Sequence, residues 1–262
     1  MIGFAKNRCN TYACSLVLVL GLLQWPSYAQ AAQDLTAIKR MAEQGDAEAQ
    51  FILAGSYTTG EGVPHDAKQA VAWYRKAAEQ GNAQAQYMLG RSYAVGEGVP
   101  QDAKQAVTWI RKAAEQGDTE AQLSLGLSYG AGEGVAQDFR QAFVWYRKAA
   151  EQGNASAQGL VGGLYGAGEG VTKDNQKAIF WYRKAAEQGD AMSQGELGKY
   201  YARGEGVAQN YSLAYVWLSV ATANGAVHVT AARDLMAAKL SRPELAEAQK
   251  LAGQYFEKYR RR

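Results

Sequence analysis

A period of 36 residues runs through most of the chain and constrains its fold more than any other feature. Tryptophan marks one position of each unit, at Trp73, Trp109, Trp145, Trp181 and Trp217. The tetrapeptide GEGV repeats with the same step, beginning at Gly60, Gly96, Gly132, Gly168 and Gly204. A fixed period of roughly 20 to 50 residues is typical of solenoids, propellers and other repeat folds.

The first half of each unit has the pattern of a helix. In residues 82–117, Asn82 is a good N-cap residue, and Ala85, Leu89 and Tyr93 follow at intervals of four. This spacing places their side chains on one face of a helix. Gly96 and Gly98 then end the helix and begin a turn.

The second half of the same unit has its own start, apolar stripe and stop. Asp102 is a candidate N-cap, and Gly117 is a candidate C-cap. The stripe between them consists of Ala106, Trp109, Ile110, Ala113 and Ala114. Neither helix can bury its apolar face alone, so neighbouring units must stack on one another. The chain is therefore expected to be all-α, with helix-loop-helix repeats.

The repeat as a whole resembles a known family. The pattern A-x-A…LG-x-x-Y…G-x-GV…A…W…KAA-x-QG is similar to the SEL-one-like repeat (SLR), a relative of the tetratricopeptide repeat. The resemblance implies a right-handed α-solenoid that binds other proteins. It also implies an adaptor or regulatory role in the bacterial envelope or at a host interface.

The period divides the chain into five full units with a half-unit at each end. The full units are residues 46–81, 82–117, 118–153, 154–189 and 190–225. Residues 32–45 match a second helix alone, and residues 226–262 match a first helix followed by a capping helix and a basic tail. Ser241 and Glu244 have the spacing of a capping box. The apolar face of the final helix comprises Leu245, Ala248, Ala252, Tyr255, Phe256 and Tyr259.

Residues 1–31 have the pattern of a secretory signal peptide. An apolar run over residues 14–23 follows two basic residues and is too short to span a bilayer. Small residues then allow cleavage after Ala29 or Ala31. The mature protein is expected in the periplasm or outside the cell, with no stable membrane anchor. The alternative is that the segment stays attached as an N-terminal anchor.

Cysteine and charge exclude several function classes. Both cysteines, Cys9 and Cys14, lie in the signal segment, so the mature chain offers no disulfide, thiolate metal site or cysteine nucleophile. Six of the 28 Lys and Arg lie near the two ends, which leaves 22 against 25 Asp and Glu. A body that is slightly acidic lacks the clustered basic face of a nucleic-acid-binding protein.

The chemically active residue types appear in structural patterns. His65 lies in a loop and His228 near the end of the chain, too far apart to share a site. One glutamate recurs in each GEGV loop, at Glu61, Glu97, Glu133, Glu169 and Glu205, where a contact with a loop backbone donor or cation is expected. Arg75, Arg111, Arg147 and Arg183 precede Glu79, Glu115, Glu151 and Glu187 by four residues, which favours ion pairs. The repeated tryptophans are expected in the core. We therefore expect no enzyme activity, cofactor or metal.

Function should lie in positions that change from unit to unit. In tetratricopeptide geometry the first helices line the concave face, where a protein or extended peptide would bind. The candidate contact residues are Glu48, Phe51, Gln84, Tyr87, Arg91, Glu120, Leu123, Leu127, Gly159, Gly163, Met192 and Lys199. For Phe51 and Leu123 the alternative is that they fill gaps between repeats. Peptidoglycan is a further candidate partner, through sugar stacking on Phe51 and Tyr87, and the oligomeric state is left open.

The glycine-rich stretch over residues 158–171 looks at first like a phosphate-binding loop. Its glycines at Gly168 and Gly170 recur in every unit, and no strand-linked binding unit accompanies them as in nucleotide sites. Because Gly159, Gly163 and Gly166 each weaken a helix, we expect this first helix to be the least stable in the solenoid. The preferred function is an exported scaffold that binds a protein. The alternative is a protein that binds or hydrolyses cell-wall glycan or peptide, with β-lactamase-like activity disfavoured because no Ser-x-x-Lys pair is present.

Overall fold

The computed structural model describes residues 28–260, and every regular element in this range is helical. The first helices of the five repeats are α2 (Ala47–Thr59), α4 (Ala83–Val95), α6 (Thr119–Ala131), α8 (Ala155–Ala167) and α10 (Ala191–Arg203). The second helices are α3 (Ala67–Glu79), α5 (Ala103–Glu115), α7 (Phe139–Glu151), α9 (Asn175–Glu187) and α11 (Tyr211–Ala223). Helix α1 (Tyr28–Glu43) precedes the repeats, and η1 (Val227–Val229), α12 (Thr230–Ala237) and α13 (Arg242–Tyr259) follow them.

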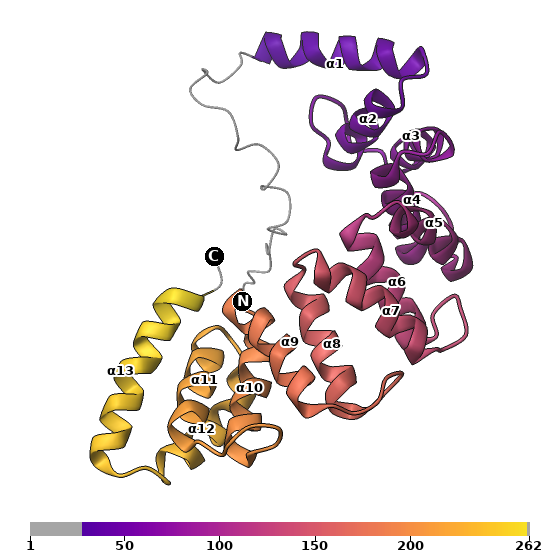
Figure 1. Cartoon of the computed structure of the whole chain (residues 1–262). Coiled ribbons are helices and arrows are strands. Elements are labelled where there is room, and N and C mark those ends of the chain that lie inside the picture. The colour runs from indigo at the N-terminus through magenta and orange to yellow at the C-terminus, as the bar shows by residue number, and fades with distance from the viewer. Residues whose placement is uncertain (1–27, 261–262) are drawn as a thin grey trace, which may run out of the picture.

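The helices pack in consecutive pairs along an arc that begins at α1 and ends at α13 (Figure 1). In the upper part of the arc, α2 lies on the inner side of α3. The expected all-α solenoid with a C-terminal capping helix is confirmed. None of the helices in residues 28–260 is both long enough and apolar enough to cross a membrane.

Caps set the length of each helix. The Asn82 side chain accepts a hydrogen bond from the Ala85 N–H at 2.8 Å, and Gly96 ends α4 in the left-handed conformation with φ of 79°. Asp102 accepts hydrogen bonds from two backbone N–H groups at the start of α5. The C-cap of α5 is Gln116, one residue before the predicted Gly117, because Gly117 with φ of 96° already turns the chain toward α6.

The two loop glycines have different roles. Gly96 is needed for its positive φ at the helix end. Gly98 also has a positive φ, and a Cβ atom there would overlap the Ala67 carbonyl of the preceding repeat. The GxG pattern therefore both turns the chain and lets one repeat touch the backbone of its neighbour.

The tryptophans are not all in the core. Trp145 and Trp217 are buried, but Trp73, Trp109 and Trp181 are only partly covered. A lysine three residues later closes the outer face of the ring, with Nζ 3.8 Å from the Trp73 centroid and 4.0 Å from that of Trp109. The predicted five-fold buried ladder is thus wrong in part. The second helices form the outer layer of the solenoid, so no further helix packs over them. The lysine cation covers the exposed face of the tryptophan ring instead.

Buried glutamines form a ladder that the sequence pattern did not single out. Gln122 donates through Nε2 to the Ala114 carbonyl at 3.2 Å, and its Oε1 accepts from Gln152 Nε2 at 2.8 Å. The same pair of bonds recurs at Gln50, Gln86, Gln158 and Gln194. Each first helix is therefore hydrogen-bonded to the end of the second helix in the preceding repeat. It is also hydrogen-bonded to the C-cap residue of the second helix in its own repeat.

Two of the four arginines expected to pair with glutamate form a hydrogen bond with the next repeat instead. Only Arg147 and Glu151 form the predicted ion pair, at 2.7 Å. Arg75 donates to the Tyr93 hydroxyl at 2.7 Å, and Arg183 to the Tyr201 hydroxyl at 2.6 Å. These tyrosines lie on the following first helix, so the arginines join repeats rather than brace a single helix.

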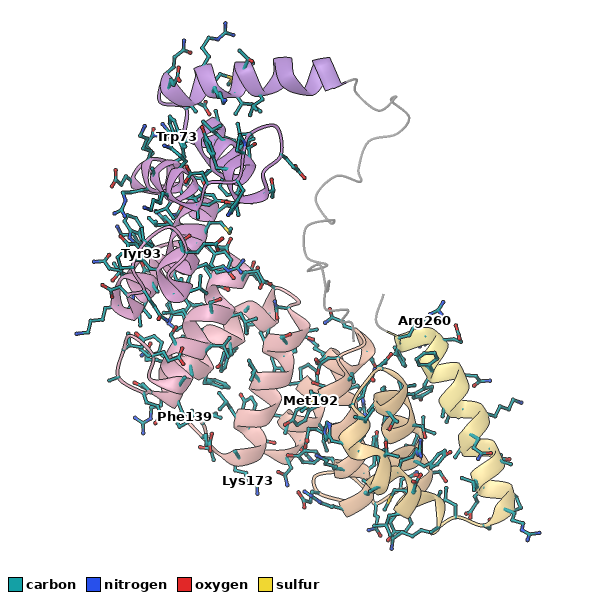
Figure 2. The ribbon with its side chains drawn as sticks, turned by 180° about the vertical axis from the view of Figure 1, so that it is seen from behind. Trp73, Tyr93, Phe139, Lys173, Met192 and Arg260 are labelled. Atoms are coloured by element: carbon teal, nitrogen blue, oxygen red, sulfur yellow. The ribbon has the colours of Figure 1, made fainter. Side chains whose placement is uncertain are left out.

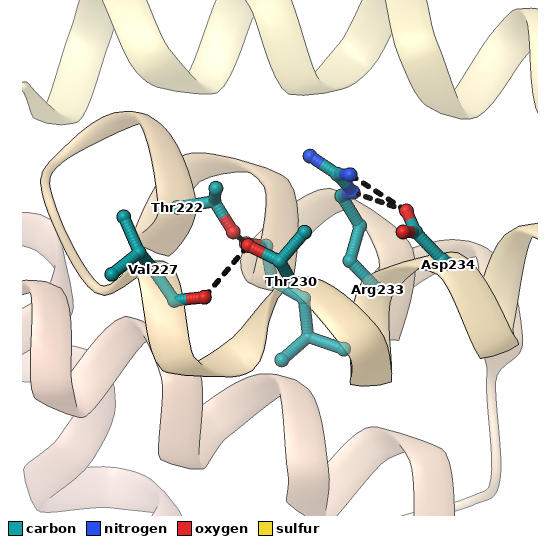
Figure 3. Close-up of polar contacts among 6 residues, drawn as sticks. Thr222, Val227, Thr230, Arg233 and Asp234 are labelled. Atoms are coloured by element: carbon teal, nitrogen blue, oxygen red, sulfur yellow. Dashed lines mark hydrogen bonds and ion pairs between the residues drawn. The ribbon is translucent and has the colours of Figure 1, made fainter.

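The C-terminal half-repeat is short and irregular. Thr230 Oγ1 donates to the Val227 carbonyl at 2.7 Å, which joins η1 to α12 (Figure 3). The guanidinium of Arg233 lies 2.6 Å from the Asp234 carboxylate on the same helix. Helix α12 ends after eight residues, and the chain then turns into α13.

Helix α13 covers the outer face of α11. Ala248 and Ala252 of α13 and Val216 of α11 are buried together. The Tyr255 and Tyr259 rings lie 5.2 and 5.7 Å from the Trp217 ring. The predicted capping box is present, since the Ser241 N–H donates to the Glu244 carboxylate at 2.8 Å.

At the N-terminal end, residues 1–27 of the predicted signal segment lie outside the described residues. The expected cleavage positions, after Ala29 or Ala31, fall in the first turn of α1. Leu35, Ile38 and Ala42 of α1 pack against Leu53 of α2, as a preceding second helix does in later repeats.

Candidate partner-binding groove

A groove of about 960 Å³ crosses the first helices of the third, fourth and fifth repeats. Its apolar centre is formed by Leu123 and Leu127 of α6, Leu160 and Leu164 of α8, and Met192 of α10. Gly159 and Gly163 of α8 also line it. Figure 2 labels two residues that line the groove, Met192 of α10 and Phe139 at the start of α7.

Glycines on α8 create this groove. Gly159 and Gly163 occupy the positions that carry Leu123 and Leu127 on α6 and Tyr87 and Arg91 on α4. Gly163 leaves open space above α8, and the missing side chain at Gly159 lets Ser193 of α10 pack against the helix backbone. The flanking apolar side chains remain in contact with solvent, and Leu127 and Met192 are 48% and 58% exposed.

Two buried tyrosines of the second helices line the groove. Tyr146 of α7 and Tyr182 of α9 are only 5% and 9% exposed. No described residue forms a hydrogen bond with either hydroxyl. Burial raises the pKa of Tyr146 to about 12, and burial is also the main cause of the raised pKa of Tyr182. Both phenols are therefore neutral donors at physiological pH.

In the first repeat the equivalent tyrosine hydroxyl has a hydrogen-bond partner, which the Tyr146 and Tyr182 hydroxyls lack. The equivalent Tyr74 hydroxyl lies 3.3 Å from Thr58 Oγ1 on α2. The positions equivalent to Thr58 are Gly130 on α6 and Gly166 on α8, which have no side chain to offer. The hydroxyls of the third and fourth repeats are thus left available to a ligand.

The polar edge of the groove is acidic. Glu169, Asp190 and Glu196 line it, and no Lys or Arg does. Glu196 is partly neutralised by Lys199, whose Nζ lies 2.6 Å from its carboxylate. Asp190 caps α10 by accepting a hydrogen bond from the Ser193 N–H at 2.8 Å. Glu169 and Asp190 have no cationic partner among the described side chains.

The structure brings part of the predicted contact set together. Five of the predicted residues line the groove: Leu123, Leu127, Gly159, Gly163 and Met192. Lys199 lies beside it through its ion pair with Glu196. These residues come from three consecutive repeats, which confines the candidate site to the C-terminal half of the solenoid.

The remaining predicted residues lie in the first three repeats and have other contacts. Glu48 accepts a hydrogen bond from Asn82 at 3.1 Å, and Glu120 accepts one from Asn154 at 2.9 Å, so both join neighbouring repeats. Gln84 is exposed and lies outside the groove.

Two aromatic residues and an arginine of the predicted set lie in the first two repeats. The Phe51 and Tyr87 side chains are half-buried against core clusters, as the gap-filling interpretation expects for Phe51. Arg91 lines a smaller cavity of about 140 Å³ together with Tyr74 and Glu97.

Sequence reasoning missed the walls that come from second helices. Tyr146, Tyr182 and the loop-proximal Phe139 belong to α7 and α9, whereas only first-helix positions were considered. One signal was available. Where the first repeat has Thr58 opposite Tyr74, the third and fourth repeats combine a tyrosine with a glycine, so a hydroxyl loses its partner.

The residues that carry most enzymatic and metal chemistry occupy structural positions. His65 Nδ1 lies 3.0 Å from the Thr58 carbonyl, and Gln101 and Gln137 bond to the helix end in the same way at their loops. Of the GEGV glutamates, only Glu205 has a cation nearby in the described chain, with Arg203 at 3.8 Å. Residues 28–260 contain no group of three His, Cys, Asp or Glu arranged to hold a metal.

The chain is similar to known proteins that share one type of helical repeat. The family model described as Sel1 repeat matches residues 47–82, 83–118, 119–154, 155–190 and 191–225. A protective antigen present in uropathogenic Escherichia coli strains, with an SLR fold, is 39% identical with a TM-score of 0.79. The match covers 87% of this chain and 49% of that chain, so the chain spans about half the length of that protein.

A second solved structure is similar over nearly its full length. A Sel1 repeat protein from Oxalobacter formigenes is 32% identical with a TM-score of 0.73, over 86% of this chain and 92% of that one. No match was found among curated proteins.

Proposed function

Because the chain belongs to the Sel1 repeat family, whose members generally mediate protein–protein interactions, we propose that it is an exported scaffold that binds a protein partner in the groove over α8. The groove carries this proposal. It combines exposed apolar side chains, glycine backbone and two tyrosine hydroxyls without a partner in the described chain, in one concavity of about 960 Å³. Apolar concavities of this size with a few polar groups are typical recognition sites.

The proposed place of action is the periplasm or the cell exterior. The charged start, short apolar run and small residues of the N-terminal segment support export. The similar uropathogenic Escherichia coli protein is a protective antigen, which supports a role at the envelope or a host interface. An adaptor or regulatory role fits a fold whose repeated polar residues are used in contacts between repeats.

Site-specific photo-crosslinking in native cells tests this proposal. A benzophenone amino acid placed at Met192 should give covalent adducts with a partner protein. The same probe at Val144, an exposed apolar position on α7 outside the groove, is the matched control. Identical adducts at both positions, or none at Met192, would reject the groove as the binding site.

A substitution pair gives an independent readout. Leu127→Glu places a charge in the apolar centre and should reduce co-purification of the crosslinked partner by at least about tenfold. Val144→Glu adds the same charge outside the groove and should leave co-purification unchanged. Circular dichroism of both variants establishes that the helices remain formed.

Binding or hydrolysis of cell-wall material is the competing function. In this alternative Phe51 and Tyr87 would stack on sugars, but their side chains are half-buried and contribute nothing to the groove. Sedimentation with peptidoglycan, together with nitrocefin and muropeptide turnover by the purified mature protein, decides between the two. Turnover that is lost on changing one groove glutamate would replace the scaffold proposal.

A further inference from the structure

We propose that the groove binds an extended peptide segment of about six residues, with an apolar centre and a Lys or Arg side chain at each end. This inference rests on the proposed function, because it names the chemistry of the partner segment. Three features of the groove carry it: its apolar centre, its unpartnered hydroxyls and its acidic ends.

The first feature explains why the segment is apolar in the middle and lies close to α8. Half-buried Leu123 and exposed Leu127 on one side, and exposed Met192 on the other, form walls around the glycine surface. A Cβ atom at Gly159 would lie 2.7 Å from Ser193 Oγ, so this part of the floor admits little beyond backbone. A peptide backbone can approach Gly163 closely while its side chains contact the leucines and the methionine.

The second feature explains why the segment is extended. Tyr146 and Tyr182 line the groove, and their hydroxyls form no hydrogen bond within the described chain. The carbonyl groups of an extended peptide are free to accept hydrogen bonds. Those of a bound helix are already used within the helix, except at its last turn. Two available donors in one groove therefore favour an extended backbone over an α-helix.

The third feature sets the length and charge. The Asp190 carboxylate lies beside Gly159, and Glu169 follows the last turn of α8. From Gly159 to Ala167 the helix axis rises about 12 Å. An extended chain rises about 3.3 Å per residue, so about four apolar residues cover this distance. One further residue at each end then meets a carboxylate that has no cation of its own.

Labelled hexapeptides test the inference on the purified mature protein. One capped peptide has lysine at both ends and four aliphatic residues between them, and a second has glutamate at both ends. Fluorescence anisotropy should show that the lysine peptide binds at least about tenfold more tightly, as one or two charge-assisted contacts require. This preference should shrink in high salt.

Variants assign the preference to named groups. Glu169→Gln combined with Asp190→Asn should remove it, and asparagine retains the N-cap of α10. Glu133→Gln is the matched control, because Glu133 has the same loop position in the third repeat but does not line the groove. Tyr146→Phe with Tyr182→Phe should weaken both peptides to a similar extent, by about tenfold.

The outcomes separate this inference from the proposed function. Equal affinity for the two peptides, a preference for the glutamate peptide, no binding of either, or tighter binding of a helix-stapled lysine peptide would overturn the inference. The scaffold proposal would stand in all four cases if the Met192 probe still captured a partner protein. Absence of that crosslink would instead count against the scaffold proposal itself.

Discussion

At the residue scale, the buried glutamine ladder is the contact that most clearly sets the spacing of the repeats. Gln122 is buried and bonds at once to the Ala114 carbonyl and to the Gln152 amide. Gln122→Ala removes both bonds, while the Ala114 carbonyl keeps its bond from the Gly117 N–H and Gln152 Nε2 keeps its bond to the Gly117 carbonyl. We expect the free energy of unfolding to fall by about 1 to 3 kcal/mol, from two lost hydrogen bonds at about 0.5 to 1.5 kcal/mol each. Urea denaturation followed by circular dichroism measures it.

The control for this change is Gln84→Ala, in an exposed glutamine of α4. Its effect should stay within about 0.5 kcal/mol. Equal destabilisation by both substitutions would mean that the ladder adds nothing beyond helix propensity.

Tyr146 also makes a residue-scale prediction, in alkaline solution. Its pKa rises to about 12 through burial, whereas an unfolded tyrosine titrates near its model value of 10.0. The unfolded state therefore loses this proton first. Stability from the neutral phenol is complete below pH 10 and is lost as the pH rises from 10 to about 12. Tyr146→Phe should reduce the alkaline loss of stability in this window, measured by denaturation at pH 9, 10 and 11.

The comparison with phenylalanine isolates Tyr146 from the lysines that titrate in the same range. A pH dependence identical to that of the original protein would show that the Tyr146 hydroxyl is solvated. It would then not be the buried donor on which the groove chemistry depends.

At the element scale, two adjacent glycines of α8 should respond in opposite ways to alanine. A Cβ atom at Gly163 would lie 3.5 Å from the Tyr182 hydroxyl, an ordinary contact, so Gly163→Ala should stabilise the helix by up to about 1 kcal/mol. At Gly162 it would lie 3.0 Å from the Tyr182 ring and 3.2 Å from the Ala178 carbonyl, so Gly162→Ala should destabilise. Thermal unfolding of the two variants compares them directly, and equal shifts of the same sign would contradict the packing.

The same glycines predict that α8 is the least stable of the first helices. Besides Gly162, which has counterparts on α4, α6 and α10, it carries Gly159, Gly163 and Gly166. Each interior glycine costs about 1 kcal/mol relative to alanine. Hydrogen exchange followed by mass spectrometry should show faster exchange in α8 than in α4, α6 or α10. Uniform protection across these helices would refute this.

The helices were predictable because cap residues and glycines mark each helix boundary locally, and the same signals occur in all five repeats. The contacts between helices of neighbouring repeats were not predictable in this way. Arg75 has Glu79 at a spacing suited to an ion pair, yet it donates a hydrogen bond to Tyr93 of the next repeat. That contact depends on how the repeats stack, which the local sequence does not show. The groove, too, was predictable only in part, because it also depends on contacts between helices. Variation at Gly159 and Gly163 was visible in sequence, but the tyrosines behind them became relevant only once α7 and α9 were placed.

At the scale of the whole molecule, each repeat contacts mainly its neighbours. Stability in such a solenoid is approximately a sum of repeat and interface contributions, and damage at one end should stay near that end. The C-terminal end depends on α13, which covers Val216 and places Tyr255 and Tyr259 on Trp217. The Tyr259 carbonyl also accepts a hydrogen bond from Gln194 at 3.2 Å, so α13 completes the last rung of the glutamine ladder.

Tyr255→Ala should therefore loosen the last repeat and spare the first. We expect the free energy of unfolding of the C-terminal repeats to fall by about 2 kcal/mol, less than for a fully buried aromatic residue because Tyr255 is half-buried. Hydrogen exchange should accelerate in α10 and α11, while α2 to α5 keep their protection. Glu257→Ala, in an exposed residue of the same helix, is the control and should change neither region.

Because the groove uses the start of α10, Tyr255→Ala should also bind the lysine-ended hexapeptide more weakly. Loss of protection spread evenly from α2 to α11 would instead mean that the solenoid unfolds as one cooperative unit, in which the cap stabilises every repeat.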